Sequence, residues 1–298
     1  MPGLNIAHLP FPLPPYRVDR FTQRSDRQVS FETIGFARQV DAQRANGLRN
    51  SVRRHHAVID VQHALRLADH LEQSSGTGVD ADTPASSLYM RKQRLKVIGA
   101  LWRLMGLMSS ATTFTIIPRG WTLTPEQLAS ADPLLLLNAF RTDLYRKGAA
   151  NAGGWLFVCI HGEFDPVTQV YRLHVHGACS LEMVPVLERL KKLPKYKSSR
   201  TLPDGSWDPV YRRVWIRRKA LNNMPDPITY LMQAFWPSRP IYIDAAGKRR
   251  RVREKRAIRY PYHAMMLLWL DRWRLQDLTL LVGLRVTRTG MIQTRERR

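Results

Sequence analysis

A predicted β-hairpin in the middle of the chain is the feature that most constrains its fold. Residues 155–164 and 170–180 are two runs typical of β-strands, and Asp165-Pro166 between them is a turn signal. Two strands joined by so short a connection pair in antiparallel fashion. The elements on either side of the hairpin then indicate the fold class.

The neighbouring segments alternate between strand and helix. The helix expected over residues 124–147 begins with Thr-Pro-Glu and stops before Gly148. In chain order the other expected elements are a strand at 112–117, a short helix at 183–193, a strand at 209–218 and a helix at 227–236 with Asp226 as its N-cap. This β-α-β-β-α-β order predicts an α+β fold of the ferredoxin-like (split βαβ) type, an antiparallel sheet with helices on one face.

Two further segments flank this predicted domain, which we place at residues 88–240. Residues 1–87 are expected to form a proline-rich basic arm, a helical segment over 29–73 and a linker from 74 to 87. A helix is expected at 88–108. Residues 241–298 form a basic extension with a helix at 260–280 and a strand at 281–293 that contains a turn at Gly290. Trp269 and Trp273 in that helix are expected in the core, with base stacking as the alternative.

The charge of the chain indicates a polyanionic partner. Lys and Arg number 47 against 24 Asp and Glu, which leaves a net charge of +23. A membrane partner is not expected, because apolar runs such as residues 264–270 are far shorter than the roughly 20 residues of a spanning helix. With two cysteines and no signal-peptide pattern, we expect the reducing cytoplasm of a bacterial host.

A histidine pair on the second hairpin strand is the first candidate site. His174 and His176 are two residues apart in a strand, so their side chains share one face, about 7 Å apart at the backbone. They can act as adjacent ligands of a divalent ion, although a hydrogen-bonded polar face is the plainer alternative. If Glu163 lies opposite Arg172, the third ligand comes from the first strand. Glu163 is the first choice, with Mg²⁺ or Mn²⁺ as the ion, and His161 is the alternative. A thiolate ligand from Cys159, on the same face, would imply a softer metal.

Tyr230, in the helix expected at 227–236, is the candidate nucleophile. A free tyrosine has a pKa near 10 and is a weak nucleophile at neutral pH. A cation that polarises a phosphodiester makes its attack feasible, and the phosphotyrosine ester conserves the energy of the broken bond. On helical spacing alone, however, a packing role for Tyr230 is favoured over a catalytic one.

Taken together, these residues resemble the HUH endonucleases, and within them the single-tyrosine rolling-circle replication initiators. The resemblance covers about residues 110–237 and three motifs in the order of that family. These are Thr112-Thr113-Phe114-Thr115-Ile116 on a strand, His174-Val175-His176 on a central strand, and Tyr230 in a later helix.

The resemblance implies that the chain nicks single-stranded DNA at a replication origin of a plasmid or phage. It implies a 5′-phosphotyrosyl intermediate on Tyr230, metal ligands at His174 and His176, and strand rejoining. A host helicase would unwind the duplex, since no Walker A pattern is present. Many members carry a lysine three residues after the tyrosine, where this chain has Gln233. Basic residues near the site, among them Arg239, could replace that charge.

Several basic residues are expected to contact DNA phosphates. They are Arg217, Arg218, Lys219, Lys248, Arg249, Arg250, Arg251 and Arg253.

Two other functions remain open at this point. A transposase of a mobile element with the same chemistry fits the motif order, whereas a relaxase usually places its tyrosine before its histidines. A non-catalytic basic nucleic-acid-binding protein on a similar sheet is the alternative of a different class, and divalent-ion binding would separate it from the enzyme.

Overall fold

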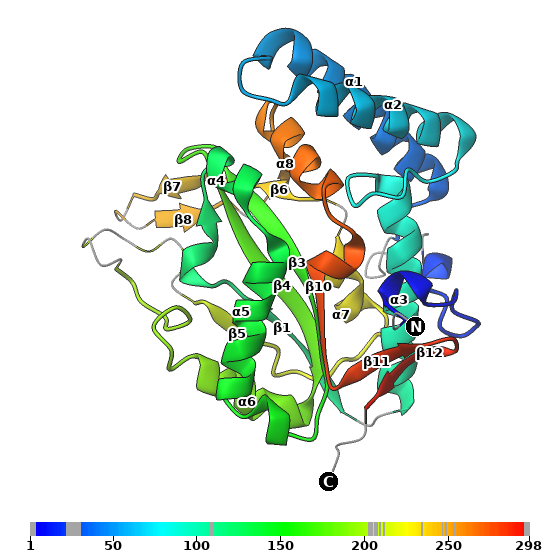
Figure 1. Ribbon diagram of the computed structural model, residues 1–298. Coiled ribbons are helices and arrows are strands. Elements are labelled where there is room, and N and C mark those ends of the chain that lie inside the picture. The colour runs from blue at the N-terminus through cyan, green and yellow to red at the C-terminus, as the bar shows by residue number, and fades with distance from the viewer. Residues whose placement is uncertain are drawn as a thin grey trace.

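The computed structural model is an α+β protein built around one eight-stranded sheet (Figure 1). It describes residues 4–21, 31–107, 110–201, 205, 208, 210, 212–233, 235–245, 247, 249–252 and 254–294. The strands follow the order β5-β1-β4-β3-β6-β9, while β10 also pairs with β3 and β2 with β4. Their bounds are β1 Ala111–Ile116, β2 Thr122–Leu123, β3 Leu156–Asp165, β4 Val170–Ser180, β5 Val214–Ile216, β6 Pro237–Ser238, β9 Arg256–Ala257 and β10 Thr279–Val282.

The predicted hairpin forms the centre of the sheet. β3 and β4 pair in antiparallel register from Leu156 opposite Cys179 to Asp165 opposite Val170. Every residue of β3 is buried, which requires apolar side chains on both faces of the sheet. The strand meets this need with Leu156, Val158 and Ile160 on one face and Phe157 and Cys159 on the other.

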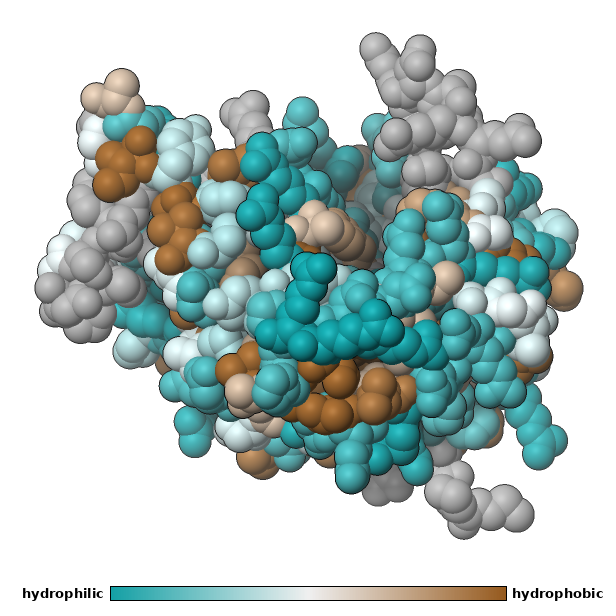
Figure 2. All heavy atoms as spheres, turned by 90° about the horizontal axis from the view of Figure 1, so that it is seen from above, coloured by the Kyte–Doolittle hydropathy of each residue, from teal (hydrophilic) through white to brown (hydrophobic). Residues whose placement is uncertain are grey.

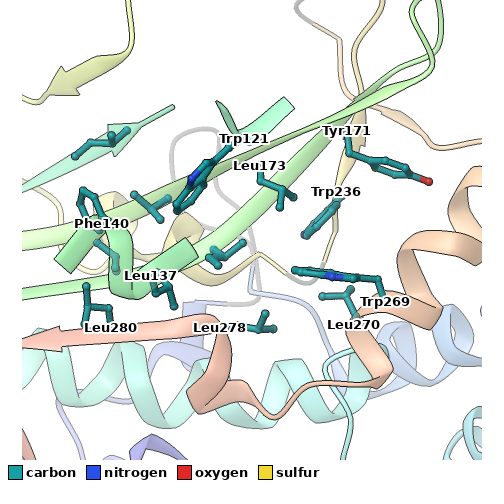
Figure 3. Close-up of a cluster of buried hydrophobic side chains, with 14 of the residues drawn as sticks. Trp121, Leu137, Phe140, Tyr171, Leu173, Trp236, Trp269, Leu270, Leu278 and Leu280 are labelled. Carbon is teal, nitrogen blue, oxygen red and sulfur yellow. The ribbon is translucent and has the colours of Figure 1, made fainter. Parts of the chain in front are cut away.

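One face of the sheet packs against helices α4 (Pro125–Ser130), α5 (Pro133–Arg146) and α6 (Val184–Leu190). Phe140 of α5 and Leu173 of β4 lie in this core (Figure 3). The single helix expected over 124–147 is two helices, because Asp132 accepts hydrogen bonds from the amides of Leu134 (2.7 Å) and Leu135 (3.4 Å) and caps a new helix at Pro133.

The opposite face is also covered, which differs from the prediction of helices on one face alone. Helix α3 (Ser87–Leu107) and the short segment of α7 (Asp226–Thr229) and η6 (Tyr230–Met232) pack there. Phe157 of β3 contributes to the same apolar cluster as Ile98 of α3 and Leu231 of η6. The histidines of β3 and β4 face this second layer.

The helix expected over 227–236 is much shorter. Asp226, the expected N-cap, is its first residue, and the N-cap position is taken by Pro225. Gln233 is already extended, because the chain turns there to place β6 beside Phe164 of β3.

The N-terminal helices share a core with the rest of the chain. α1 (Ile34–His55) and α2 (Val61–Thr77) form a pair that packs on α8 (Tyr262–Asp271), where His63 Nε2 lies 2.7 Å from a carboxylate oxygen of Asp271. One apolar cluster includes residues of all three predicted segments, such as Leu67, Val158 and Leu267.

The helix expected over 260–280 ends at Asp271 and is followed by η7 (Leu275–Leu278) and β10. Trp269 in α8 is buried against Trp236, with ring centroids 5.6 Å apart, and its indole Nε1 donates to the carbonyl of Ala131 at 2.9 Å. Figure 3 shows the two indoles beside each other. Trp269 is therefore a core residue, as expected.

Two small hairpins complete the fold. β7 (Ile241–Ile243) pairs with β8 (Arg249–Arg251), and β11 (Leu284–Thr287) pairs with β12 (Gly290–Gln293). The strand expected over 281–293 is therefore the end of β10 plus this second hairpin, with Gly290 at a φ of 141° after its turn. The remaining short helices are η1 Ile6–His8, η2 Val18–Phe21, η3 Arg119–Trp121, η4 Ala149–Asn151 and η5 Leu181–Met183. None of the described helices is long and apolar enough to cross a membrane.

Candidate metal centre

Three histidine side chains meet on the second face of the sheet. The ring nitrogens of His161, His174 and His176 lie within 4.8 Å of one another. Nδ1 of His161 is 3.3 Å from Nε2 of His174, which is 3.2 Å from Nε2 of His176. Nitrogens that share one ion at about 2.0–2.1 Å are separated by roughly 3.0–3.4 Å, so two of the three separations fit a common ion.

The second ring nitrogen of each histidine has its own partner. Nε2 of His161 lies 2.9 Å from the carbonyl oxygen of Phe235, and Nδ1 of His174 lies 3.1 Å from that of Arg172. A carbonyl oxygen can only accept, so these two nitrogens carry the ring protons. Nδ1 of His176 lies 2.9 Å from the hydroxyl of Thr115. Such outer partners fix the orientation and tautomer of metal-binding histidines.

The nitrogens that face one another are consequently left without protons in the neutral rings. His161 Nδ1 and His174 Nε2 both present lone pairs, and two lone pairs at 3.3 Å repel unless a cation lies between them. Burial and the neighbouring His174 hold the pKa of both His161 and His176 well below the usual histidine value, which favours neutral, ligand-competent rings. The donor set therefore fits a divalent metal ion.

The third member of the group is His161, the alternative in the sequence prediction, and not Glu163, the first choice. The register has Glu163 opposite Arg172 and His161 opposite His174, so the assumption that placed all four on one face holds. In that register His161 lies opposite His174, next to His176 on the same face of β4, whereas Glu163 lies opposite Arg172 and is farther from His176. Three imidazoles favour a first-row transition ion such as Mn²⁺ over Mg²⁺, which prefers oxygen ligands.

Cys159 is not part of this group in the described structure. It lies opposite His176 in the register, and burial raises the pKa of its thiol to about 12.

Tyr230 lies directly beside the histidines. Its ring packs edge-on against the ring of His176, with centroids 5.1 Å apart. Ile228 and Leu231 on either side of it are buried in the cluster beneath α3, and Arg94 of α3 donates to the carbonyl of Thr229 at 2.9 Å. These contacts hold the tyrosine against the histidine group.

The environment of Tyr230 acts on its pKa in both directions. Burial raises the pKa above its usual value, and this effect outweighs the lowering by the Thr113 and Thr115 hydroxyls and the Arg217 charge. The phenol is therefore protonated at neutral pH. Attack by its oxygen requires additional positive charge nearby, such as a metal ion.

Two cations near the histidines were only partly expected. Arg239 and Lys255 both contribute to lowering the pKa of His161 and His176, which places their charges close to the group. Arg239 is one of the residues expected to replace the charge of the lysine that many HUH endonucleases carry where this chain has Gln233. Lys255 is not among the residues singled out from the sequence, although the high Lys and Arg content of residues 247–259 is a signal for it.

The basic residues expected to bind DNA fall into two places. Arg217, Arg218 and Lys219 follow β5 and line a cavity of about 500 Å³ together with Trp102. Arg218 also pairs with Glu188, and Arg250 on β8 pairs with Asp244 at 2.8 Å. Only the backbone of Arg249 and Arg251 is described, and Lys248 and Arg253 lie outside the described residues.

The face of the molecule seen from above is mainly hydrophilic, with small apolar patches between the polar residues (Figure 2). Such a surface agrees with the excess of Lys and Arg in the sequence. Comparison with family models, with curated proteins and with solved structures finds no match for this chain.

Proposed function

We propose that the chain is a metal-dependent nicking and joining endonuclease that acts on single-stranded DNA through Tyr230. The observation that carries this proposal is the contact between Tyr230 and His176, one of three histidines whose ring nitrogens lie within 4.8 Å of one another. A nucleophile beside a metal-binding group on a basic protein fits phosphodiester transesterification.

The strand arrangement supports the same proposal. β5, β1, β4 and β3 are consecutive antiparallel neighbours, and β1 and β3 are joined through α5 with β4 between them. This is the order expected of a split βαβ sheet. The histidine pair then lies on a central strand, as in the HUH endonucleases that the sequence resembles.

The proposed reaction is a transesterification at phosphorus. The phenolic oxygen of Tyr230 attacks the scissile phosphate and loses its proton, a P–O5′ phosphotyrosyl ester remains, and the P–O3′ bond breaks to leave a protonated 3′-hydroxyl. A divalent ion held by His161, His174 and His176 would offset the charge that develops on the phosphate. Arg217, whose charge already favours the phenolate, supports the attack. Reversal by a 3′-hydroxyl rejoins the strand.

In this proposal the substrate is the single-stranded region of a replication origin of a plasmid or phage, opened by a host helicase. A transposition reaction of a mobile element would use the same steps.

The test is an adduct assay on circular single-stranded DNA with Mn²⁺. We expect a covalent protein–DNA species that is absent with EDTA and with Tyr230→Phe. Tight binding of DNA without any adduct would instead support a non-catalytic nucleic-acid-binding protein. Cleavage that persists in Tyr230→Phe would exclude Tyr230 as the nucleophile.

A further inference from the structure

A second cavity, of about 450 Å³, lies next to the histidine group. It is lined by Phe36 and Arg44 of α1, Arg94 of α3, and Gln233, Phe235 and Lys255 from the segment after η6. Phe235 links the cavity to the metal centre, because its carbonyl oxygen accepts the hydrogen bond from His161. The volume falls in the range that holds small ligands.

Arg94 is a buried cation in the wall of this cavity, with 7% of its surface exposed. Its two terminal nitrogens are engaged, one by Glu32 and one by the carbonyl of Thr229. Its Nε is buried and has no hydrogen-bond partner among the described residues. Arg94 is therefore held in place by its protein partners, and it acts on the cavity through its charge and not as a free donor.

The charges around the cavity favour an anion. Arg44, Arg94 and Lys255 are three cations, and the carboxylate of Glu32 is the single acidic group among the lining residues, which leaves 3 − 1 = 2 positive charges in excess. Lys255 is exposed, and its Nζ lies 3.3 Å from the side-chain oxygen of Gln233. A phosphate group offers the acceptor oxygens that Arg and Lys bind.

Two aromatic side chains on the same cavity are exposed. Phe36 is 56% and Phe235 is 38% exposed, although both are large apolar residues. Exposed aromatic rings beside cations are the combination that binds the bases and backbone of single-stranded nucleic acids.

We propose that this cavity binds one nucleotide of the single strand next to the scissile phosphate. Lys255 holds its phosphate, the charge of Arg94 lies behind it in the cavity wall, and the base stacks on Phe36 and Phe235. The inference rests on the proposed function for the identity of the substrate. It assigns the N-terminal helices a direct role in holding the DNA, since Phe36 and Arg44 belong to α1.

The test measures binding apart from catalysis, in a Tyr230→Phe background that cannot form an adduct. Fluorescence anisotropy compares a labelled short oligothymidylate with an abasic strand of equal length and phosphate number. Phe36→Ala should weaken binding of the oligothymidylate about 5- to 150-fold and leave the abasic strand unaffected. Lys255→Gln should weaken binding of both strands and lower the salt slope by about 0.7.

Matched control variants are available on the same chain. Ile34→Ala removes an equally exposed apolar side chain of α1, and Lys197→Gln removes an exposed lysine; neither residue lines the cavity. Both controls should bind like the parent. Equal losses for both strands in Phe36→Ala, or no loss, would overturn the assignment of the base site.

The outcome is separable from that of the proposed nickase. An adduct in the Tyr230-containing protein together with unchanged binding in Phe36→Ala and Lys255→Gln retains the nickase and excludes this nucleotide site. Base-dependent binding through Phe36 without any adduct retains the nucleotide site and excludes the nickase.

Discussion

His161 and Glu163 are two residues apart on β3, share one face of the sheet and differ in what they contribute to the site. Only His161 directs a ring nitrogen toward His174, while its other nitrogen is bound to the carbonyl of Phe235. We therefore expect His161→Ala to weaken Mn²⁺ binding by at least about 100-fold, more than the loss of an outer partner causes. Glu163→Gln should change the affinity by less than tenfold. Calorimetric titration of Mn²⁺ measures both.

One result of the Mn²⁺ titrations would contradict the assignment of His161 to the group. A loss of Mn²⁺ affinity in Glu163→Gln that equals the loss in His161→Ala would place a carboxylate in the coordination sphere. Thermal unfolding of each variant without metal checks that the sheet is intact.

The sequence could identify the histidine pair but could not decide which residue of β3 joins it, because that depends on individual contacts that are not local. His174 and His176 share a face by strand geometry alone, whatever the register. The contact from Phe235 to His161 joins residues 74 positions apart in the chain, and the register that brings His161 opposite His174 is not fixed by the pattern of either strand. No local pattern in β3 distinguishes His161 from Glu163.

Gly162, between these two residues, has a packing role that can be tested. A Cβ at this position would lie 2.5 Å from the ring of Trp236, the residue after Phe235. Gly162→Ala should lower the free energy of unfolding by about 1–3 kcal/mol through overpacking. Gly120→Ala, whose Cβ would meet nothing within 4 Å, is the matched control. Urea unfolding measures both, and equal stability of the two variants would contradict the expected clash.

At the level of elements, local signals predicted the central hairpin and helix starts better than the lengths of the other elements, such as the strand expected over 209–218, of which only Val214–Ile216 is β5. The hairpin and α3 were confirmed to within one or two residues, because alternation and apolar stripes are local properties. The helix at 227–236 was too long, since its later residues are used to reach β3 and His161 instead. Tertiary pairing overrides helical propensity there.

The start of α3 depends on a residue from another helix. Asp41 of α1 is buried, and its carboxylate accepts from the amides of Ser87 (2.6 Å) and Leu88 (3.2 Å) and from the hydroxyl of Ser86 (2.7 Å). Asp41→Ala leaves these buried donors unpaired and should cost about 3 kcal/mol of unfolding free energy.

A local cap provides the control for this effect. Asp60 caps α2 through the amide of His63 at 2.9 Å in an exposed position, so Asp60→Ala should cost only about 1 kcal/mol. Urea denaturation of both variants should show the larger loss for Asp41→Ala. Equal losses would mean that Asp41 acts as a simple helix cap and does not join α1 to α3.

For the whole molecule, the composition and the order of expected strands and helices predicted an α+β class and a basic protein. They did not predict how the N-terminal helices and the C-terminal extension pack on the sheet. The domain boundaries predicted near residues 87 and 240 follow changes in composition. In the structure, residues of α1, α2 and α8 share one apolar cluster with the sheet. The contacts that achieve this, such as His63 with Asp271, connect residues 208 positions apart and have no signature in either local segment.

The same assembly partly buries His263 of α8, and this makes the stability of the whole molecule depend on pH. The ring of His263 packs against Tyr260, with centroids 5.1 Å apart, and near Arg44 of α1. Burial, and then the Arg44 charge, lower the pKa of His263 to about 3. In the unfolded chain the pKa is about 6.5, so between these values the unfolded state binds the additional proton.

The stability that neutral His263 contributes is therefore fully present above pH 6.5 and is lost as the pH falls toward 3. Between pH 7 and pH 5 the loss from this residue is about 2 kcal/mol.

His263→Gln removes the titration, so its unfolding free energy should fall by about 2 kcal/mol less than that of the parent over the same interval. Urea denaturation with EDTA present measures both, which keeps metal binding out of the comparison. Because His161 and His176 also have lowered pKa values, some pH dependence should persist in the variant. Parallel pH profiles for the two proteins would mean that His263 titrates normally, and that α8 opens to solvent without global unfolding.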